Sequence, residues 1–194
     1  MSDRGRSADP RAERVRTRLR EAAFALAHER PVDEITVGDL VARAEVSRQV
    51  FYRHFRDRDD AVARAFGDAF ATVADAEGAD ARSRILELFA FADEHASLCR
   101  HVVPSTANQY VLAAYRDALT APCQQIAGQG MAVLDTVAPL TAQAVTRFLV
   151  GGFMEVLRSW MEDPETTDLH ARAGAALDTV DALLGISSSH ERPL

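Results

Sequence analysis

The sequence has no lysine, only two cysteines and no long apolar run. Cys99 and Cys123 are too few for a disulfide framework, and they suit a reducing compartment. No stretch approaches the roughly 18 apolar residues that a membrane span needs. No apolar segment follows the N-terminal arginines as it would in a signal peptide. These absences predict a cytoplasmic protein that does not bind a membrane.

Charge is distributed unevenly, and the formal net charge of −7 is mildly unfavourable for a nucleic-acid-binding protein. Residues 1–60 contain 13 arginines against 12 acidic residues, whereas residues 61–194 contain 9 arginines against 17 acidic residues. The acidic excess therefore lies in the second part of the chain. The distribution matters more than the sum, so the first part can still approach a polyanion.

Strand patterns are missing, because β-branched residues do not alternate with polar ones and alanine is abundant throughout. We therefore expect an all-α chain. Asp57 is expected to cap the fourth helix, Thr120 and Pro122 to open a helix, Pro139 to end it, and Asp163 with Pro164 to start the last one. The expected helices span about 11–29, 37–44, 48–54, 58–77, 81–99, 108–119, 120–137, 141–162 and 164–185.

The segment from Ile35 to Phe55 predicts two short helices joined by a turn at 44–46. Thr36 suits the N-cap of the first helix with Asp39 as its capping-box partner, and Ser47 suits the N-cap of the second. A small core shared with the preceding helix is expected at Ile35, Val37, Leu40, Val46 and Phe51. This is the helix-turn-helix arrangement, whose second helix enters the major groove of DNA.

The second helix of the pair has side chains that suit DNA on its outward side. Arginine pairs with guanine and glutamine with adenine, so Arg48 and Gln49 suit base edges, and Val50 suits a thymine methyl group. Hydroxyl, imidazole and guanidinium groups suit phosphate oxygens. Such groups stand at Ser47, Tyr52, Arg53 and His54.

Roughly residues 15–62 resemble the DNA-binding domain of the tetracycline-repressor (TetR) family. The matching residues are Ala22-Ala23-Phe24, Ile35-Thr36-Val37-Gly38-Asp39-Leu40, Val46-Ser47, Phe51-Tyr52-Arg53-His54-Phe55 and Arg58-Asp59-Asp60. The resemblance implies an N-terminal three-helix DNA-binding domain at 12–60 and a helical effector-binding and dimerisation domain at 61–185. Polar tails at 1–11 and 186–194 are expected to be disordered.

The resemblance also implies partners and contacts. Thr36, Ser47, Tyr52, His54 and Arg58 would contact phosphate, while Arg48, Gln49 and Val50 would face bases. The partners would be double-stranded DNA with a palindromic operator, a second copy of the chain, and a small-molecule effector of unknown identity. The predicted function is sequence-specific transcription regulation by a repressor that an effector releases from its operator.

The chain departs from the family pattern at three positions. Glu45 stands in the turn where the family has glycine, so a positive φ there would cost about 1 kcal/mol, and its carboxylate adds negative charge near DNA. Val41 replaces a small residue, which would set the two helices further apart. Arg58 takes over the charge of the family's lysine after Phe55.

Seven arginines precede or line the first helix, and two interpretations of them stay open. They can form an arm that enters the minor groove, or a tail that is merely solvated. These arginines are Arg4, Arg6, Arg11, Arg14, Arg16, Arg18 and Arg20.

Apolar stripes on the helix after Thr141 and on the last helix favour a four-helix interface between two chains. The alternative is a core within one chain. Gly151 and Gly152 weaken a helix but allow another helix to approach closely. The interface is expected at Val145, Leu149, Gly152, Phe153, Val156, Trp160, Leu177, Val180 and Leu184.

Aromatic walls with a few polar groups are typical of small-molecule pockets. For most of the candidates the alternative of plain core is favoured; they are Phe89, His95, Cys99, Tyr110, Tyr115, Met131 and Phe148. His95, Cys99 and His101, with distant Cys123, raise the question of a metal. However, no CxxC or HExxH spacing is present, so we expect neither metal nor cofactor.

Two other functions compete with regulation. An interaction protein could keep the fold and have lost sequence-specific DNA binding, which Glu45 and the acidic second part would favour. An enzyme is not expected, because the sequence has no nucleophile elbow, phosphate loop or paired-carboxylate signature.

Overall fold

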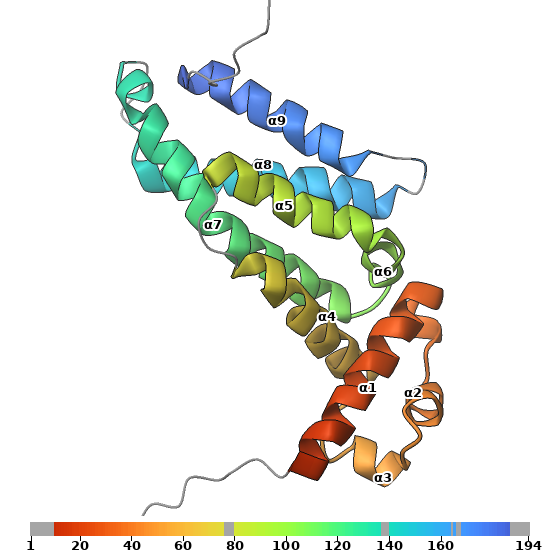
Figure 1. The fold of residues 1–194 in the computed structure, drawn as a ribbon. Helices are drawn as coiled ribbons and strands as arrows, with labels where there is room; N and C mark the ends of the chain where they lie inside the picture. The colour runs from red at the N-terminus through yellow and green to blue at the C-terminus, as the bar shows by residue number, and fades with distance from the viewer. Residues whose placement is uncertain (1–9, 76–79, 137–139, 164, 166–167, 187–194) are drawn as a thin grey trace, which may run out of the picture. The chain divides into compact units, whose positions relative to one another are not determined.

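The computed structural model describes residues 10–75, 80–136, 140–163, 165 and 168–186, and within these ranges the chain is helical with no strand (Figure 1). The expected all-α fold is thereby confirmed. No helix in the described ranges is long and apolar enough to cross a membrane. The elements are α1 (Pro10–Glu29), the 3-10 helix η1 (Val32–Glu34), α2 (Val37–Arg43), α3 (Arg48–Phe51), α4 (Arg58–Ala74), α5 (Ala81–Glu94), α6 (Ala96–His101), α7 (Ala107–Leu134), α8 (Ala142–Glu162) and α9 (Leu169–Leu184).

Contacts divide the chain into two units. Unit 1 comprises Met1–Ala69 and Ser97–Val111, and unit 2 comprises Phe70–Ala96 and Leu112–Leu194. The division differs from the expected boundary at residue 60, because the first turns of α4 and the segment 97–111 belong to unit 1. The chain therefore passes from one unit to the other within α4, at the start of α6 and within α7.

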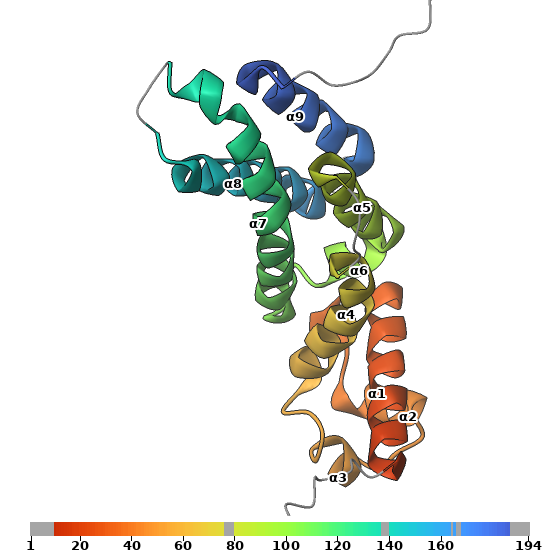
Figure 2. The ribbon, with the colours of Figure 1, turned by 60° about the vertical axis from the view of Figure 1, so that its left-hand side comes forward.

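Unit 1 is built around α1, which packs against α2, while α2 packs against α3. Figures 1 and 2 both show α2 beside α1. The core that these helices share contains Ile35, Leu40 and Phe51, all fully buried as expected, while Val37 and Val46 are half-buried. Phe55 adds to it, with its ring centre 5.6 Å from that of Phe51. The helix-turn-helix thus rests on an apolar base.

Hydrogen bonds tie residues 97–111 to the rest of unit 1. The His101 ring nitrogen Nδ1 donates to the Ala27 carbonyl at 2.8 Å. The Thr106 amide donates to the Asp59 carboxylate at 3.1 Å, and the Arg56 guanidinium donates to the Tyr110 hydroxyl at 3.3 Å. These bonds explain why the segment groups with the first helices although it lies far along the chain.

Unit 2 is held by α9, which packs against α5 and α8. The Phe70 ring lies 4.5 Å from Tyr115 and 5.4 Å from Phe91, centre to centre. Phe89 of α5 meets Phe153 of α8 at 6.1 Å. The Arg82 guanidinium also joins α5 to α9, since it reaches the buried Asp181 carboxylate at 2.9 Å.

Several helix boundaries differ from the sequence prediction. The expected helix over 81–99 divides at His95 into α5 and α6. The two helices expected over 108–137 form the single α7, which continues through Pro122. Pro122 leaves the Ala118 carbonyl without its helical amide, but Leu119, Cys123 and Ile126 on the same helix are buried, and this packing keeps α7 continuous.

The last helix also begins later than expected. Its N-cap is Asp168, whose carboxylate accepts from the Ala171 amide at 3.0 Å, so Asp163 does not start it. Gly185 ends α9 with φ 64°, as the sequence predicts for a helix that stops at this glycine. At the other end of the chain, Pro10 and Arg11 are already helical, whereas 1–9 and 187–194, Pro139 and Pro164 lie outside the described residues.

Candidate nucleic-acid interface

The start of α2 carries the predicted capping box. The Thr36 amide donates to the Asp39 carboxylate at 2.8 Å, and the Asp39 amide donates to the Thr36 hydroxyl oxygen at 3.1 Å. The Thr36 hydroxyl and the Thr36 amide both donate to the Asp39 carboxylate, and together with Arg30 at 2.9 Å they hold the pKa of Asp39 below its usual range. Thr36 is exposed, but its hydroxyl already donates to Asp39 at 2.7 Å, so a phosphate contact would compete with the cap.

The turn between α2 and α3 brings Glu45 into the left-handed region with φ 52°. The Val46 amide donates to the Val41 carbonyl at 3.0 Å and the Glu45 amide to the Ala42 carbonyl at 3.3 Å, which is the Schellman pattern that normally has glycine at this position. The expected positive φ at Glu45 is thereby confirmed. Val41 itself is half-buried.

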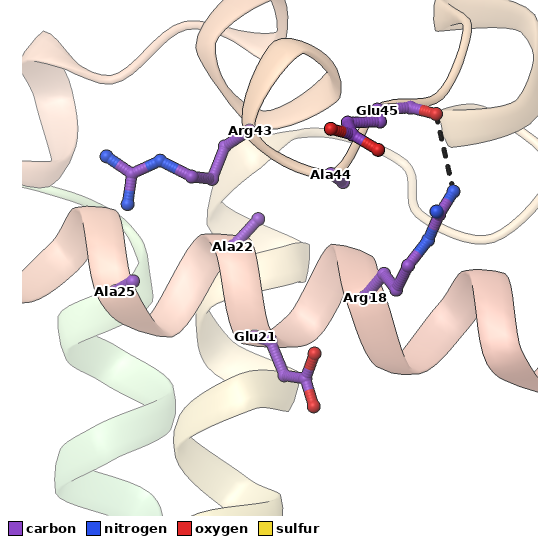
Figure 3. A pocket seen from close by; sticks show the side chains of 7 residues that line it. All are labelled: Arg18, Glu21, Ala22, Ala25, Arg43, Ala44 and Glu45. Carbon is purple, nitrogen blue, oxygen red and sulfur yellow. Dashed lines mark hydrogen bonds between the residues drawn. The ribbon is translucent and has the colours of Figure 1, made fainter.

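Figure 3 shows Arg18 of α1 reaching the Glu45 carbonyl, at 3.3 Å. Arg18 and Glu45 border a shallow pocket whose other lining residues include Ala22, Ala25 and Ala44. The contact fixes the backbone of the turn against α1. Arg18, one of the seven N-terminal arginines, therefore has a structural role within unit 1.

The helix α3 presents a polar, exposed face. Ser47 caps it by accepting from the Val50 amide at 3.3 Å. Arg48, Gln49 and Arg53 are exposed, and Tyr52 is 59% exposed. The helix is shorter than expected, since residues 52–54 form a turn after Phe51. A buried Phe51 and an exposed row of donors and acceptors are what a groove-reading helix needs.

Arg48 lies back over the start of α2. Its Nη2 atom is 3.2 Å from the point where a β-carbon on Gly38 would stand. The absence of a side chain at Gly38 therefore leaves room for the guanidinium. The backbone of Arg48 stands at the capped start of α3.

Arg58 has a structural role in unit 1. Its guanidinium donates to the carbonyls of Asp33 at 2.5 Å and Ile35 at 2.9 Å, and to the Asp59 carboxylate at 3.0 Å. These bonds hold the chain that leads into α2. These bonds use three of the five N–H donors of Arg58, so a phosphate contact, which the family resemblance implied, would fall to the remaining donors.

His54 and Arg53 face a cleft between α1 and α4. The cleft has a volume of about 500 Å³, and it is lined by Arg16, Arg20, Arg53, His54, Arg64, Gly67 and Asp68. Partial burial, and then the neighbouring Arg16 and Arg53, lower the pKa of His54, although Glu13 opposes this effect. These effects favour the neutral form of the His54 ring in the free protein. Arg64 escaped the sequence analysis, because only folding places it near His54.

The seven candidate effector residues are divided between the two units. Cys99 and Tyr110 belong to unit 1, and Tyr110 is half exposed. Phe89 and Tyr115 are buried in unit 2, His95 and Met131 are half-buried there, and Phe148 is 78% exposed. A pocket at these residues therefore stays a prediction.

Six of the nine candidate interface residues lie in the core of the chain itself: Val145, Leu149, Phe153, Trp160, Leu177 and Leu184. At these six positions, burial within a single chain, the alternative to an interface, accounts for the environment of the side chain. Val156 and Val180 are half-buried, and Gly152 is exposed. The open face of α8 instead presents Phe148, Gly151 and Gly152.

Both cysteines are buried, and burial raises the pKa of Cys99 and of Cys123 to about 12. A thiol with such a pKa is a poor nucleophile near neutral pH. Within the described ranges, no three His, Cys, Asp or Glu side chains come close enough to hold a metal ion. His101 uses one ring nitrogen on the Ala27 carbonyl.

Comparison with known proteins gives one family match. The model of "Bacterial regulatory proteins, tetR family" matches residues 19–65, which contain the capping box, the Glu45 turn and α3. No curated protein matches the chain in sequence.

Solved structures share the fold over most of the chain. The dihydroxyacetone kinase operon activator DhaS is 15% identical with a TM-score of 0.63, covering 90% of this chain and 98% of its own. A tetR-family transcriptional regulator from Streptomyces coelicolor is 20% identical with a TM-score of 0.62, covering 90% and 82%. FadR from Bacillus subtilis, solved with stearoyl-CoA, is 15% identical with a TM-score of 0.60, covering 86% and 98%.

Proposed function

We propose that this chain is a TetR-family regulator, which the family match of residues 19–65 supports, and that it binds a specific, palindromic sequence of double-stranded DNA as a homodimer. In this proposal α3 lies in the major groove, with Arg48 and Gln49 at base edges and Tyr52 on phosphate. The observation that carries the proposal is that α3 exposes a polar face to solvent. The helix starts at the Ser47 cap, and its apolar residue Phe51 is buried in unit 1.

The homodimer is supported by the open face of α8. Phe148 is 78% exposed, and a β-carbon on Gly151 or Gly152 would meet nothing within 4 Å. On α9, Leu183 is 70% exposed. A large exposed aromatic beside two helical glycines suits the close approach of a helix from a second copy, which would bury apolar surface that water now covers.

We also propose that a small-molecule effector binds unit 2 and releases the protein from DNA, so that the chain acts as a repressor. The FadR structure holds stearoyl-CoA in a similar fold, which supports a ligand-binding role for such helices. DhaS is an activator, so the fold by itself does not decide between activation and repression of transcription. A reporter under the selected operator assigns the sign: repression requires that removing the protein raises transcription.

Selection from a random duplex library, at a stated salt concentration, tests sequence-specific binding. An enriched palindrome with half-sites about 34–36 Å apart is expected, since that distance separates successive major grooves on one face. Weak, salt-sensitive binding without an enriched motif would instead favour the interaction protein that has lost sequence-specific DNA recognition.

Two variants separate base reading from phosphate contact. Arg48→Ala should relax the preference at one or two base positions by about 1–3 kcal/mol. Tyr52→Ala should weaken binding to all duplexes alike, because a phosphate contact carries no sequence information. An Arg48→Ala variant with unchanged motif and affinity would show that another residue reads the bases.

A further inference from the structure

The cleft between α1 and α4 collects cationic side chains from three parts of the chain. Arg16 and Arg20 come from α1, Arg53 follows α3, and Arg64 belongs to α4. His54 lines the same cleft. All of these residues belong to unit 1, so the cleft lies within one compact unit. The sequence spacing between them is long, and only the packed unit brings them together.

Ion pairs occupy only part of this cationic surface. Arg20 bridges Glu13 at 3.2 Å and Asp68, and it therefore serves to position its neighbours. Arg16 uses Nη1 on Glu13 at 2.7 Å, and Arg64 uses Nε on Asp60 at 3.0 Å.

Donors remain available after these pairs are counted. Each guanidinium has five N–H donors, so Arg16 and Arg64 keep terminal donors. Arg53 makes no ion pair with any residue in the described ranges.

We propose that this cleft binds a phosphate group of the DNA backbone beside the base pairs that α3 reads. The proposal rests on the proposed function and extends it with Arg16 and Arg64 as phosphate contacts. Guanidinium groups bind phosphate oxygens through paired, charge-assisted hydrogen bonds. A volume of about 500 Å³ leaves room for a phosphodiester.

The place of the cleft argues for DNA as the source of that phosphate. Arg53 and His54 line the cleft, and they also belong to the turn that directly continues α3. A duplex lying on the exposed face of α3 would therefore have its backbone next to the cleft. A phosphate bound in this cleft would fix the register of the duplex without reading its sequence.

Gly67 gives a probe that leaves the packing of unit 1 unchanged. It lines the cleft, it is exposed, and a β-carbon there would meet nothing within 4 Å. Gly67→Glu places a carboxylate in the cleft, and Gly67→Gln fills the same space without charge. Gly128→Glu on α7 is the matched control, because Gly128 is also an exposed helical glycine with nothing within 4 Å, but it lies in unit 2.

The experiment measures the affinity of the full-length protein for a fixed duplex over a range of salt concentrations, after thermal melts show that each variant is folded. Gly67→Glu should bind about tenfold more weakly at low salt, with the same factor on any duplex, and should lower the log–log salt slope by about 1 per protomer. Gly67→Gln should stay within about threefold of the wild type, and Gly128→Glu within about twofold.

The proposal that the cleft binds a DNA phosphate would be overturned if Gly67→Glu and Gly128→Glu had equal affinities for a duplex that the wild type binds. The proposed function would remain. A wild type that binds no duplex would instead overturn the proposed function, and with it DNA as the occupant. Melting with pyrophosphate at matched ionic strength tests a free ligand. Stabilisation of the wild type but not of Gly67→Glu, with DNA affinity unchanged, would assign the cleft to free phosphate and overturn the proposal.

Discussion

Glu45 adopts a left-handed backbone conformation that residues other than glycine rarely adopt. Its φ of 52° completes the hydrogen-bonded end of α2 and aims the chain into α3. The bond from Arg18 to its carbonyl, at 3.3 Å, holds the turn in place. The chain therefore tolerates local strain at the point where the two helices of the DNA-binding pair must be joined tightly.

Glu45→Gly is expected to stabilise the protein. Glycine takes a positive φ without the steric cost, so the free energy of unfolding should rise by about 1 kcal/mol and Tm by about 2–4 °C. Chemical denaturation measures the change. Glu45→Ala removes the charge but keeps the β-carbon, so it should leave stability nearly unchanged; an equal gain in both variants would identify the charge as the cause.

His54 predicts a pH dependence of DNA binding. Burial and its arginine neighbours Arg16 and Arg53 lower its pKa in the free protein, with Glu13 acting in the opposite direction, and Arg20, Arg64 and Asp68 line the same cleft. A bound phosphate favours the protonated ring and raises this pKa. Binding then takes up a proton, and affinity should rise as pH falls from about 7.5 towards 5.5.

Titration of binding against pH measures this uptake, which should reach about one proton per protomer at most. His54→Gln should remove that part of the pH dependence. His170→Gln, at an exposed position of α9, serves as the control and should keep it. A wild type whose affinity does not change with pH would show that His54 makes no contact with the phosphate.

At the scale of elements, close packing decides where helices can run. The α7 helix continues through Pro122 because its apolar face is buried, although a proline inside a helix generally kinks or ends it. At Gly130 the same helix meets α9 so closely that a β-carbon would stand 2.9 Å from Leu184. Glycine is required there by the neighbouring helix and not by the backbone of α7.

Gly130→Ala is therefore expected to lower the free energy of unfolding by about 1–3 kcal/mol, because the new methyl group overlaps Leu184. Gly128→Ala, two residues earlier and open to solvent, should raise it by about 0.5–1 kcal/mol through helix propensity. Urea denaturation of the two variants measures both changes. A gain at both positions would show that α9 moves aside at little cost.

At the scale of the whole molecule, unit 2 exposes large apolar side chains to solvent. Phe148 and Leu183 are both largely exposed, whereas Trp160 is 1% exposed and belongs to the core of the chain. A test of dimerisation must therefore use the open face. A charge at Trp160 would damage the fold before it could report on assembly.

Phe148→Glu is expected to convert a dimer into a folded monomer, because two carboxylates would be buried at a twofold interface. Light scattering coupled to gel filtration gives the mass, and a thermal melt reports the fold. Gly128→Glu adds the same charge at an exposed position of a different helix, α7, and should remain a dimer. Phe148→Glu that stays dimeric would place the interface on another surface.

The sequence by itself determined the local features of the DNA-binding unit. The Thr36–Asp39 capping box, the Ser47 cap, the positive φ at Glu45 and the end of α9 at Gly185 were all predicted. Each of these signals depends on residues within about five positions of one another, where backbone geometry and side-chain chemistry are set locally.

Only the tertiary structure decided the features that join distant segments. Pro122 lies inside α7, Arg58 holds the carbonyls before α2, and Trp160 is core instead of interface surface. Arg64 reaches the cleft of His54 only because α4 packs near α1. Apolar periodicity shows that a helix face is buried but not what buries it, so these outcomes depend on contacts between residues that are far apart in the chain.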